Sequence, residues 1–191
     1  MFAFCGVRKL VSLDLGNYFD TSNVTDMYRM FYMCGNRRMK ELDLGEKFDT
    51  SAAKNMRQMF GVYKSLEKIN LGDKFTLANA ENIREFLTYV THIKKIYLGM
   101  NFSKINEIAL NDLEKFKKEE WTIWHIFDLD KAAKDYTIYV ADETVKSLIL
   151  EKAPGFQGKI EIITEIVPGR LFKDMTILGN GLEYTFEHDF S

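Results

Sequence analysis

An internal repeat of 27 to 29 residues constrains the fold of this chain more than any other feature. A Met-Phe pair recurs with a period of 29, at residues 1–2, 30–31 and 59–60. Tetrapeptides related to Leu-Asp-Leu-Gly follow the same order, the later steps shortening to 27: 13–16, 42–45, 69–72 and 96–99. Four similar units therefore follow one another. Each is expected to be stabilised by its neighbours, as in other repeat proteins.

Each unit carries one predicted strand. The pattern Leu-x-x-Leu-x-Leu, seen first at Leu10, Leu13 and Leu15, ends with the period of two that a half-buried strand requires. Equivalent residues should stack, so that Leu42 lies between Leu13 and Ile69. We expect an α+β fold, a leucine-rich-repeat solenoid of about four units of 27–29 residues with a small C-terminal α/β capping module.

The repeat motifs also resemble a known family. Met-Phe-x-x-Cys-Gly is followed by Leu-x-x-Leu-Asp-Leu-Gly and then by Phe-Asp-Thr-Ser-Asn-Val-Thr-Asp-Met. This order is similar to the BspA-type leucine-rich repeat, in particular to its Mycoplasma surface-lipoprotein form, over residues 1 to about 112. The resemblance implies a bacterial surface or secreted protein that makes adhesive contacts with a host or matrix.

Three regions are predicted: leucine-rich repeats over 1–112, a helical cap over 113–135 and a small α/β module over 136–191. Asn111 or Asp112 is a candidate N-cap for a helix with an apolar face at Leu113 and Phe116, extending towards Trp121 and Trp124.

The predicted module has four elements. Residues 136–140 have the composition of a strand, and Asp142 is placed to cap a helix over 143–152 that ends at Pro154-Gly155. Residues 159–167 alternate like a strand. Residues 175–178 and 182–186 form a predicted hairpin around Gly179-Asn180-Gly181.

Composition and charge limit the classes of partner that we expect this chain to bind. The net charge of −2 and the isoelectric point near 6.0 give no global basic field, so a nucleic-acid partner is not expected. No apolar run approaches the roughly 20 residues of a membrane span. The first residues do not read as a signal peptide, and a cell-surface or secreted location is expected from the resemblance alone.

The candidate chemical groups favour structural roles. Cys5 and Cys34 share a repeat position with Tyr63 and Val90, so buried free thiols are favoured over a disulfide. The three histidines are scattered and offer the thiols no base: His92, His125 and His188. We therefore expect no enzymatic activity, no metal site and no cofactor.

Two further patterns suggest a metal or ligand site, but we interpret both as structural features. Asp128-Leu129-Asp130 with Asp135 resembles a calcium loop, but Ala133 and Tyr139 stand where that loop needs glycine and glutamate. A methionine cluster in the first two units suggests a metal or an adaptable groove: Met27, Met30, Met33, Met39, Met56 and Met59. Four of them, Met27, Met30, Met56 and Met59, occupy ladder positions that Ile83 and Phe86 take in the third unit, so core packing is favoured.

The remaining candidate surface is the exposed side of the predicted strands. Its outward positions form two rows, which change from acidic to basic along the repeats: Ser12, Glu41, Lys68 and Lys95 in the first, Asp14, Asp43, Asn70 and Tyr97 in the second. A charge gradient of this kind would orient a protein or glycan ligand. Polar residues here also satisfy solubility alone.

Two functions follow. The first is a non-enzymatic recognition or adhesion module that binds a protein or glycan partner. The second is a structural component of a larger assembly, such as a surface array or a phage adhesion device. The first unit would leave Phe2, Leu10, Leu13 and Leu15 facing water, so we expect either upstream repeats or another chain, as in an oligomer, to cover them.

Overall fold

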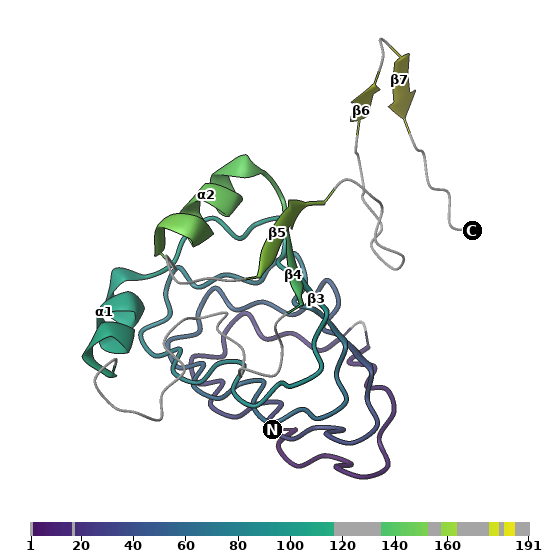
Figure 1. Cartoon of the computed structure of the whole chain (residues 1–191), viewed down its shortest axis with the longest axis vertical. Coiled ribbons are helices and arrows are strands. Elements are labelled where there is room, and N and C mark those ends of the chain that lie inside the picture. Colours follow the sequence, from purple (N-terminus) through teal and green to yellow (C-terminus); the bar gives the residue numbers. More distant parts are fainter. Residues whose placement is uncertain are drawn as a thin grey trace.

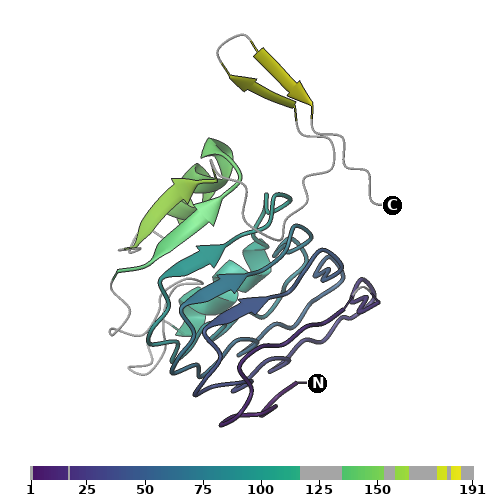
Figure 2. The same ribbon diagram turned by 90° about the vertical axis from the view of Figure 1, so that its right-hand side faces the viewer.

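The structure is a computed structural model that describes residues 2–16, 18–116, 135–152, 158–163, 176–179 and 182–185. Its main feature is a five-stranded parallel sheet in the order β1-β2-β3-β4-β5 (Figures 1 and 2). The strands are β1 (Glu41–Asp43), β2 (Lys68–Asn70), β3 (Lys95–Tyr97), β4 (Thr137–Val140) and β5 (Lys159–Ile162). Helices α1 (Glu107–Phe116) and α2 (Glu143–Lys152) complete this part of the chain.

The repeat register predicted from the sequence is present in the sheet. Leu42 pairs with Ile69, and Ile69 pairs with Ile96, so that equivalent residues stand side by side. All three side chains are buried. The period-two pattern therefore places one apolar side chain of each three-residue strand in the core.

The predicted fold class, an α+β leucine-rich-repeat solenoid with a C-terminal α/β capping module, was wrong. The structure has one all-parallel sheet, in which β4 and β5 from the expected module continue the strands of the repeats. Two helices occur among the described residues. The reason is that β3 presents unpaired backbone groups at its edge, which β4 satisfies: Thr137 N donates to Lys94 O and Leu98 N donates to Tyr139 O.

The first unit also departs from its prediction. Residues 10–16 form no strand, although Leu10, Leu13 and Leu15 pack half-buried against the core. Backbone bonds still join this unit to the second, because Phe2 N donates to Met30 O and Gly35 N donates to Cys5 O.

Aromatic and methionine side chains fill the core between units. Phe31 stacks on Phe60 at a ring-centroid distance of 5.5 Å, and Phe75 stacks on Phe102 at 6.0 Å. The methionines assigned to the core are buried where the repeat places them: Met27, Met30, Met39, Met56 and Met59. Met33 is half-buried.

Residues with a left-handed backbone conformation recur at two equivalent positions of the repeat, in the segment that precedes each strand position. The non-glycine residues with positive φ fall into two equivalent sets: Arg29, Gln58 and Glu85, and Phe4, Met33, Val62 and Tyr89. Most of their N–H groups are held by the next unit; Met33 N, for example, donates to Gly61 O at 2.9 Å. Inter-unit hydrogen bonds thus accompany a conformation that L-residues rarely adopt.

The C-terminal elements agree in part with the sequence. Strand β4 and helix α2 lie where they were predicted, and Asp142 caps α2 by accepting a bond from Val145 N at 3.0 Å. Strands β6 (Thr176–Gly179) and β7 (Leu182–Thr185) form the predicted antiparallel hairpin. Helix α1 begins earlier than expected, and Asn106 rather than Asn111 or Asp112 accepts from an N–H of its first turn.

Candidate partner-binding surface

The structure brings six of the eight predicted surface residues together on three neighbouring strands. Glu41, Lys68 and Lys95 stand in one row of the sheet. Asp43, Asn70 and Tyr97 stand in the parallel row. Of these only Asp43 is exposed: Asn70 is 3% and Tyr97 9% exposed, so the prediction that both face solvent was wrong. Ser12 and Asp14 are exposed in the first unit but belong to no strand.

Three of these residues shape the turns that follow the strands. Asp14 and Asp43 accept hydrogen bonds through Oδ1 from the N–H groups of Gly16 and Gly45, at 2.8 and 2.9 Å. Asn70 does the same for Gly72 N at 3.2 Å and also donates through Nδ2 to Asp43 Oδ2 at 3.1 Å. These three glycines have positive φ, which explains why a glycine ends the motif in the first three units. At Gly99, which ends the fourth, a Cβ would lie 1.9 Å from Gly72 O, so close approach of the backbones requires glycine there.

Charged and aromatic side chains form a connected row across the exposed face. Lys68 pairs with Glu41 at 3.3 Å and lies 5.7 Å from the centre of the Tyr97 ring. Tyr97 is only 9% exposed because its ring stacks on Tyr139 with centroids 4.6 Å apart. Lys95 lies 5.8 Å from the Tyr139 ring. The face therefore combines cations with aromatic surface.

The row extends beyond the residues that the repeat indicated. Tyr139 stands beside Tyr97 and Thr137 beside Lys95, followed on β5 by Glu161 and Lys159. The sequence predicted the strand over 136–140. It gave no sign that this strand would pair with β3, because no repeat motif spans the intervening residues.

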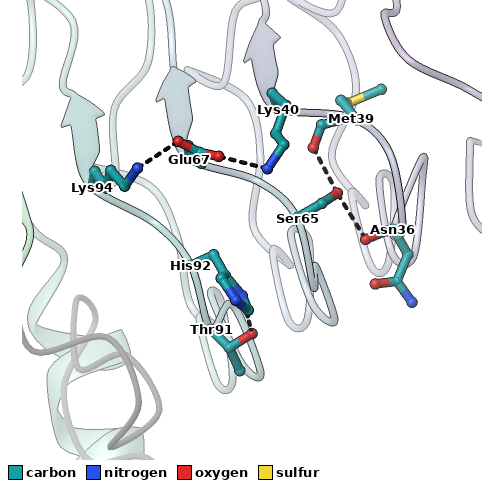
Figure 3. Close-up of polar contacts among 8 residues, drawn as sticks. All are labelled: Asn36, Met39, Lys40, Ser65, Glu67, Thr91, His92 and Lys94. Carbon is teal, nitrogen blue, oxygen red and sulfur yellow. Dashed lines mark hydrogen bonds and ion pairs between the residues drawn. The ribbon is translucent and has the colours of Figure 1, made fainter.

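Glu67 stands at the start of β2 between two lysines from the adjacent units (Figure 3). Its carboxylate accepts hydrogen bonds from Lys40 Nζ at 2.6 Å and Lys94 Nζ at 2.7 Å. The two lysine hydrogen bonds lower the pKa of Glu67 from 4.5 to about 2. This carboxylate is therefore ionised over the whole physiological range.

The turns below these residues are joined by polar contacts (Figure 3). Lys64 N donates to Asn36 Oδ1 at 2.8 Å, and Ser65 Oγ lies 2.9 Å from Met39 O. His92 is exposed on the next turn, with Nδ1 2.9 Å from Thr91 Oγ1.

Both cysteines are free thiols. Cys34 is fully buried and Cys5 half-buried. Burial, with a smaller contribution from Cys5, raises the pKa of Cys34 to about 12, so this thiol stays protonated at neutral pH. In the next unit the equivalent Tyr63 donates its hydroxyl to Phe31 O at 2.6 Å.

Several sequence interpretations fall elsewhere. The calcium-like segment at 128–130, His125, His188 and the two tryptophans lie outside the described residues. Across the parts of the chain that the structure describes, no group of three or more His, Cys, Asp or Glu side chains is placed to hold a metal ion.

The fold and this surface define a repeat protein in which the second, third and fourth units supply one strand each to a common parallel sheet. The chain belongs to the family described as Mycoplasma protein of unknown function, DUF285, which matches residues 1–124. No curated protein and no solved structure matches it. Within the described ranges, none of the helices has the length and apolar character needed to cross a bilayer.

Proposed function

We propose that this chain is a non-enzymatic recognition module of a bacterial surface or secreted protein, and that it binds a protein or glycan partner. The observation that carries the proposal is the row of charged and aromatic side chains across β1 to β4. The sequence resemblance to BspA-type surface repeats supports the surface location and the adhesive role.

The exposed ion pairs on this face leave it able to engage a partner. The Lys68–Glu41 pair is partly solvated, with the glutamate side chain 66% exposed. Such pairs contribute only about 0–1 kcal/mol, so exchanging them for contacts with a ligand costs little. The half-buried Tyr139, which stacks on the buried Tyr97, adds an aromatic side chain of the kind common in binding hot spots.

The test is a binding screen of the full chain against arrays of host-surface glycans and proteins. A variant with Lys68→Glu and Lys95→Glu should lose at least about tenfold in affinity for ligands bound through the face, because two cations are reversed there. The matched control, Lys47→Glu with Lys74→Glu, makes the same change in net charge at exposed positions away from it. Equal binding by all three proteins would contradict a role for the face.

An assembly component is the second candidate, favoured by the exposed apolar surface of the first unit. Phe4 is 57%, Val11 60% and Tyr18 99% exposed. Exposed apolar side chains grouped in one unit are typical of surfaces that dock onto another chain. Light scattering tests this: a concentration-dependent molar mass above that of one chain supports it, and a monomer at all concentrations contradicts self-assembly.

A further inference from the structure

A set of basic turns lies at the amino-terminal ends of the strands. In the first three units, the turn before the strand position carries exposed cations: Arg8, Lys9, Arg37, Arg38 and Lys64. Ion pairs elsewhere in the described chain occupy other lysines and arginines, and none of these five takes part in one. Their charges are therefore available to an anionic ligand.

Backbone hydrogen bonds fix these turns side by side. Gly35 N donates to Cys5 O at 2.8 Å, Arg37 N to Val7 O at 3.1 Å and Lys64 N to Asn36 O at 3.0 Å. Backbones joined in this way lie about 5 Å apart. The five cations consequently form one line along the stacking direction, which we call the basic edge.

The strand starts extend this line with a second row. Lys40 and Lys94 flank Glu67, so the row adds two cations and one carboxylate next to the turns (Figure 3). Glu67 is ionised and compensates one of the two lysine charges, so this row keeps one excess positive charge. The basic edge and this row together carry excess positive charge.

The opposite ends of the strands carry charges of both signs. Asp14 and Asp43 lie at the strand positions, and the turns that follow carry Asp20, Glu46 and Asp49 together with Lys47 and Lys74. The turns before the strand positions of the first three units, residues 5–9, 34–38 and 63–65, contain no Asp or Glu, although the chain as a whole has a net charge of −2. Segregated charge of this kind focuses the field and attracts an oppositely charged ligand to one place.

We propose that the basic edge binds a sulfated polysaccharide. A linear row of fixed cations suits a linear chain that carries anions at intervals. The paired Arg37 and Arg38 offer planar groups that can donate two parallel hydrogen bonds to an oxyanion such as a sulfate. The net negative charge of the chain disfavours a long nucleic acid that would run beyond the row.

This inference rests on the proposed recognition function and adds a ligand class and a second surface to it. The experiment measures heparin binding by the full chain at increasing salt, comparing wild type with Arg37→Glu plus Arg38→Glu. We expect wild type to bind. The variant should lose at least about tenfold in affinity, and the slope of log affinity against log salt should fall by about two, one for each contact removed.

The control is Lys47→Glu with Lys74→Glu, which changes net charge by the same amount at two exposed positions outside the basic edge. It should bind heparin within about twofold of wild type. Both variants alter exposed side chains and should keep the melting temperature of wild type. A loss of equal size in both variants would overturn the proposal, since it would show only a response to net charge.

Two further ligands, desulfated heparin and a single-stranded DNA, test whether binding requires a sulfated polysaccharide. Desulfated heparin should bind at least about tenfold more weakly than heparin, because the sulfates supply the anions. Any of three results would overturn the assignment: no binding of heparin, equal binding of desulfated heparin, or tighter binding of a single-stranded DNA 20-mer than of heparin. The Lys68→Glu, Lys95→Glu array test reports separately on the sheet face, so that failure of one surface is distinguishable from failure of the other.

Discussion

Buried threonine hydroxyls join neighbouring units at the turns that follow the strand positions. Thr21 Oγ1 donates to Asp49 O at 2.8 Å and accepts from Asp49 N at 2.7 Å. Thr50 makes the same two contacts with Thr76 in the next unit. The threonine of the Phe-Asp-Thr-Ser motif therefore supplies buried inter-unit hydrogen bonds.

Thr50→Val should destabilise the fold by about 1–3 kcal/mol, because the isosteric methyl group leaves the backbone N–H and C=O of Thr76 without this partner. Denaturant unfolding measures the change. Thr25→Val is the control, since Thr25 is exposed, and should stay within about 0.5 kcal/mol of wild type. A cost for Thr50→Val no larger than that of the control would show that the hydroxyl is not needed.

Glu67 makes stability depend on pH at the acidic end. Its pKa in the folded state, about 2, lies below its ordinary 4.5, so the ionised form is favoured by folding. The stabilisation is complete above about pH 4.5 and is lost as pH falls towards 2. Glu67→Gln should therefore melt below wild type at pH 7, and this difference should disappear towards pH 2.

Thermal melts at low salt between pH 7 and pH 2 measure this difference. Glu46→Gln, at an exposed position outside the ion pairs of the described chain, serves as the control and should follow wild type throughout. A melting difference for Glu67→Gln that stays constant with pH would contradict the role of the Lys40–Glu67–Lys94 contacts.

At the scale of the elements, strands of three residues gain their stability from stacking. Each places one apolar residue in the core between equivalent residues of its neighbours. Leu42 is 1% exposed and pairs with Ile69. Short strands of this kind are not stable alone, so their burial against adjacent units decides whether they form.

Leu42→Ala should cost about 2–5 kcal/mol, through lost burial and the cavity left behind. The same truncation at the exposed Leu150 of α2 is the control and should cost much less. Chemical denaturation measures the change in the free energy of unfolding for both variants, with the same denaturant dependence (m-value) used for each protein. A loss below about 0.5 kcal/mol at Leu42 would contradict the register of the repeats.

The elements also show what the sequence could predict. The pairing of Leu42 with Ile69 and Ile96 followed from the motif spacing, because a fixed period and a period-two pattern leave one register. The pairing of Ile96 with Ile138 did not, because partner choice across a long intervening segment depends on which edge is open in space. Ser12 and Asp14 were expected in a strand, but residues 10–16 form no strand and lie outside the paired sheet.

The candidate surface was predictable to a similar extent. The row from Glu41 to Lys95 faces solvent as expected, but in the row from Asp43 to Tyr97 both Asn70 and Tyr97 are buried. Their bonds were not predictable, since stacking of Tyr97 on Tyr139 and capping of Gly45 by Asp43 depend on three-dimensional neighbours. The basic edge was not predictable from the sequence, because its cations are dispersed along the chain and come together only when the turns stack.

At the scale of the whole molecule, the central claim is that strands β4 and β5 share one sheet with the strands of the repeats. The junction is the pairing of β3 with β4, where backbone bonds and the Tyr97–Tyr139 stack join segments far apart in sequence. The exposed face of the proposed recognition module runs across this junction. Its continuity therefore requires that the junction exist in solution.

A double-mutant cycle on Tyr97→Ala and Tyr139→Ala, read out by the free energy of unfolding, tests this junction most directly. The rings are 4.6 Å apart at their centroids, so the cycle should give a coupling energy of about 0.5–1.5 kcal/mol. The control cycle pairs Tyr97→Ala with Tyr89→Ala, an exposed tyrosine outside the sheet, and should give a coupling near zero. A near-zero coupling between Tyr97 and Tyr139 would contradict the shared sheet.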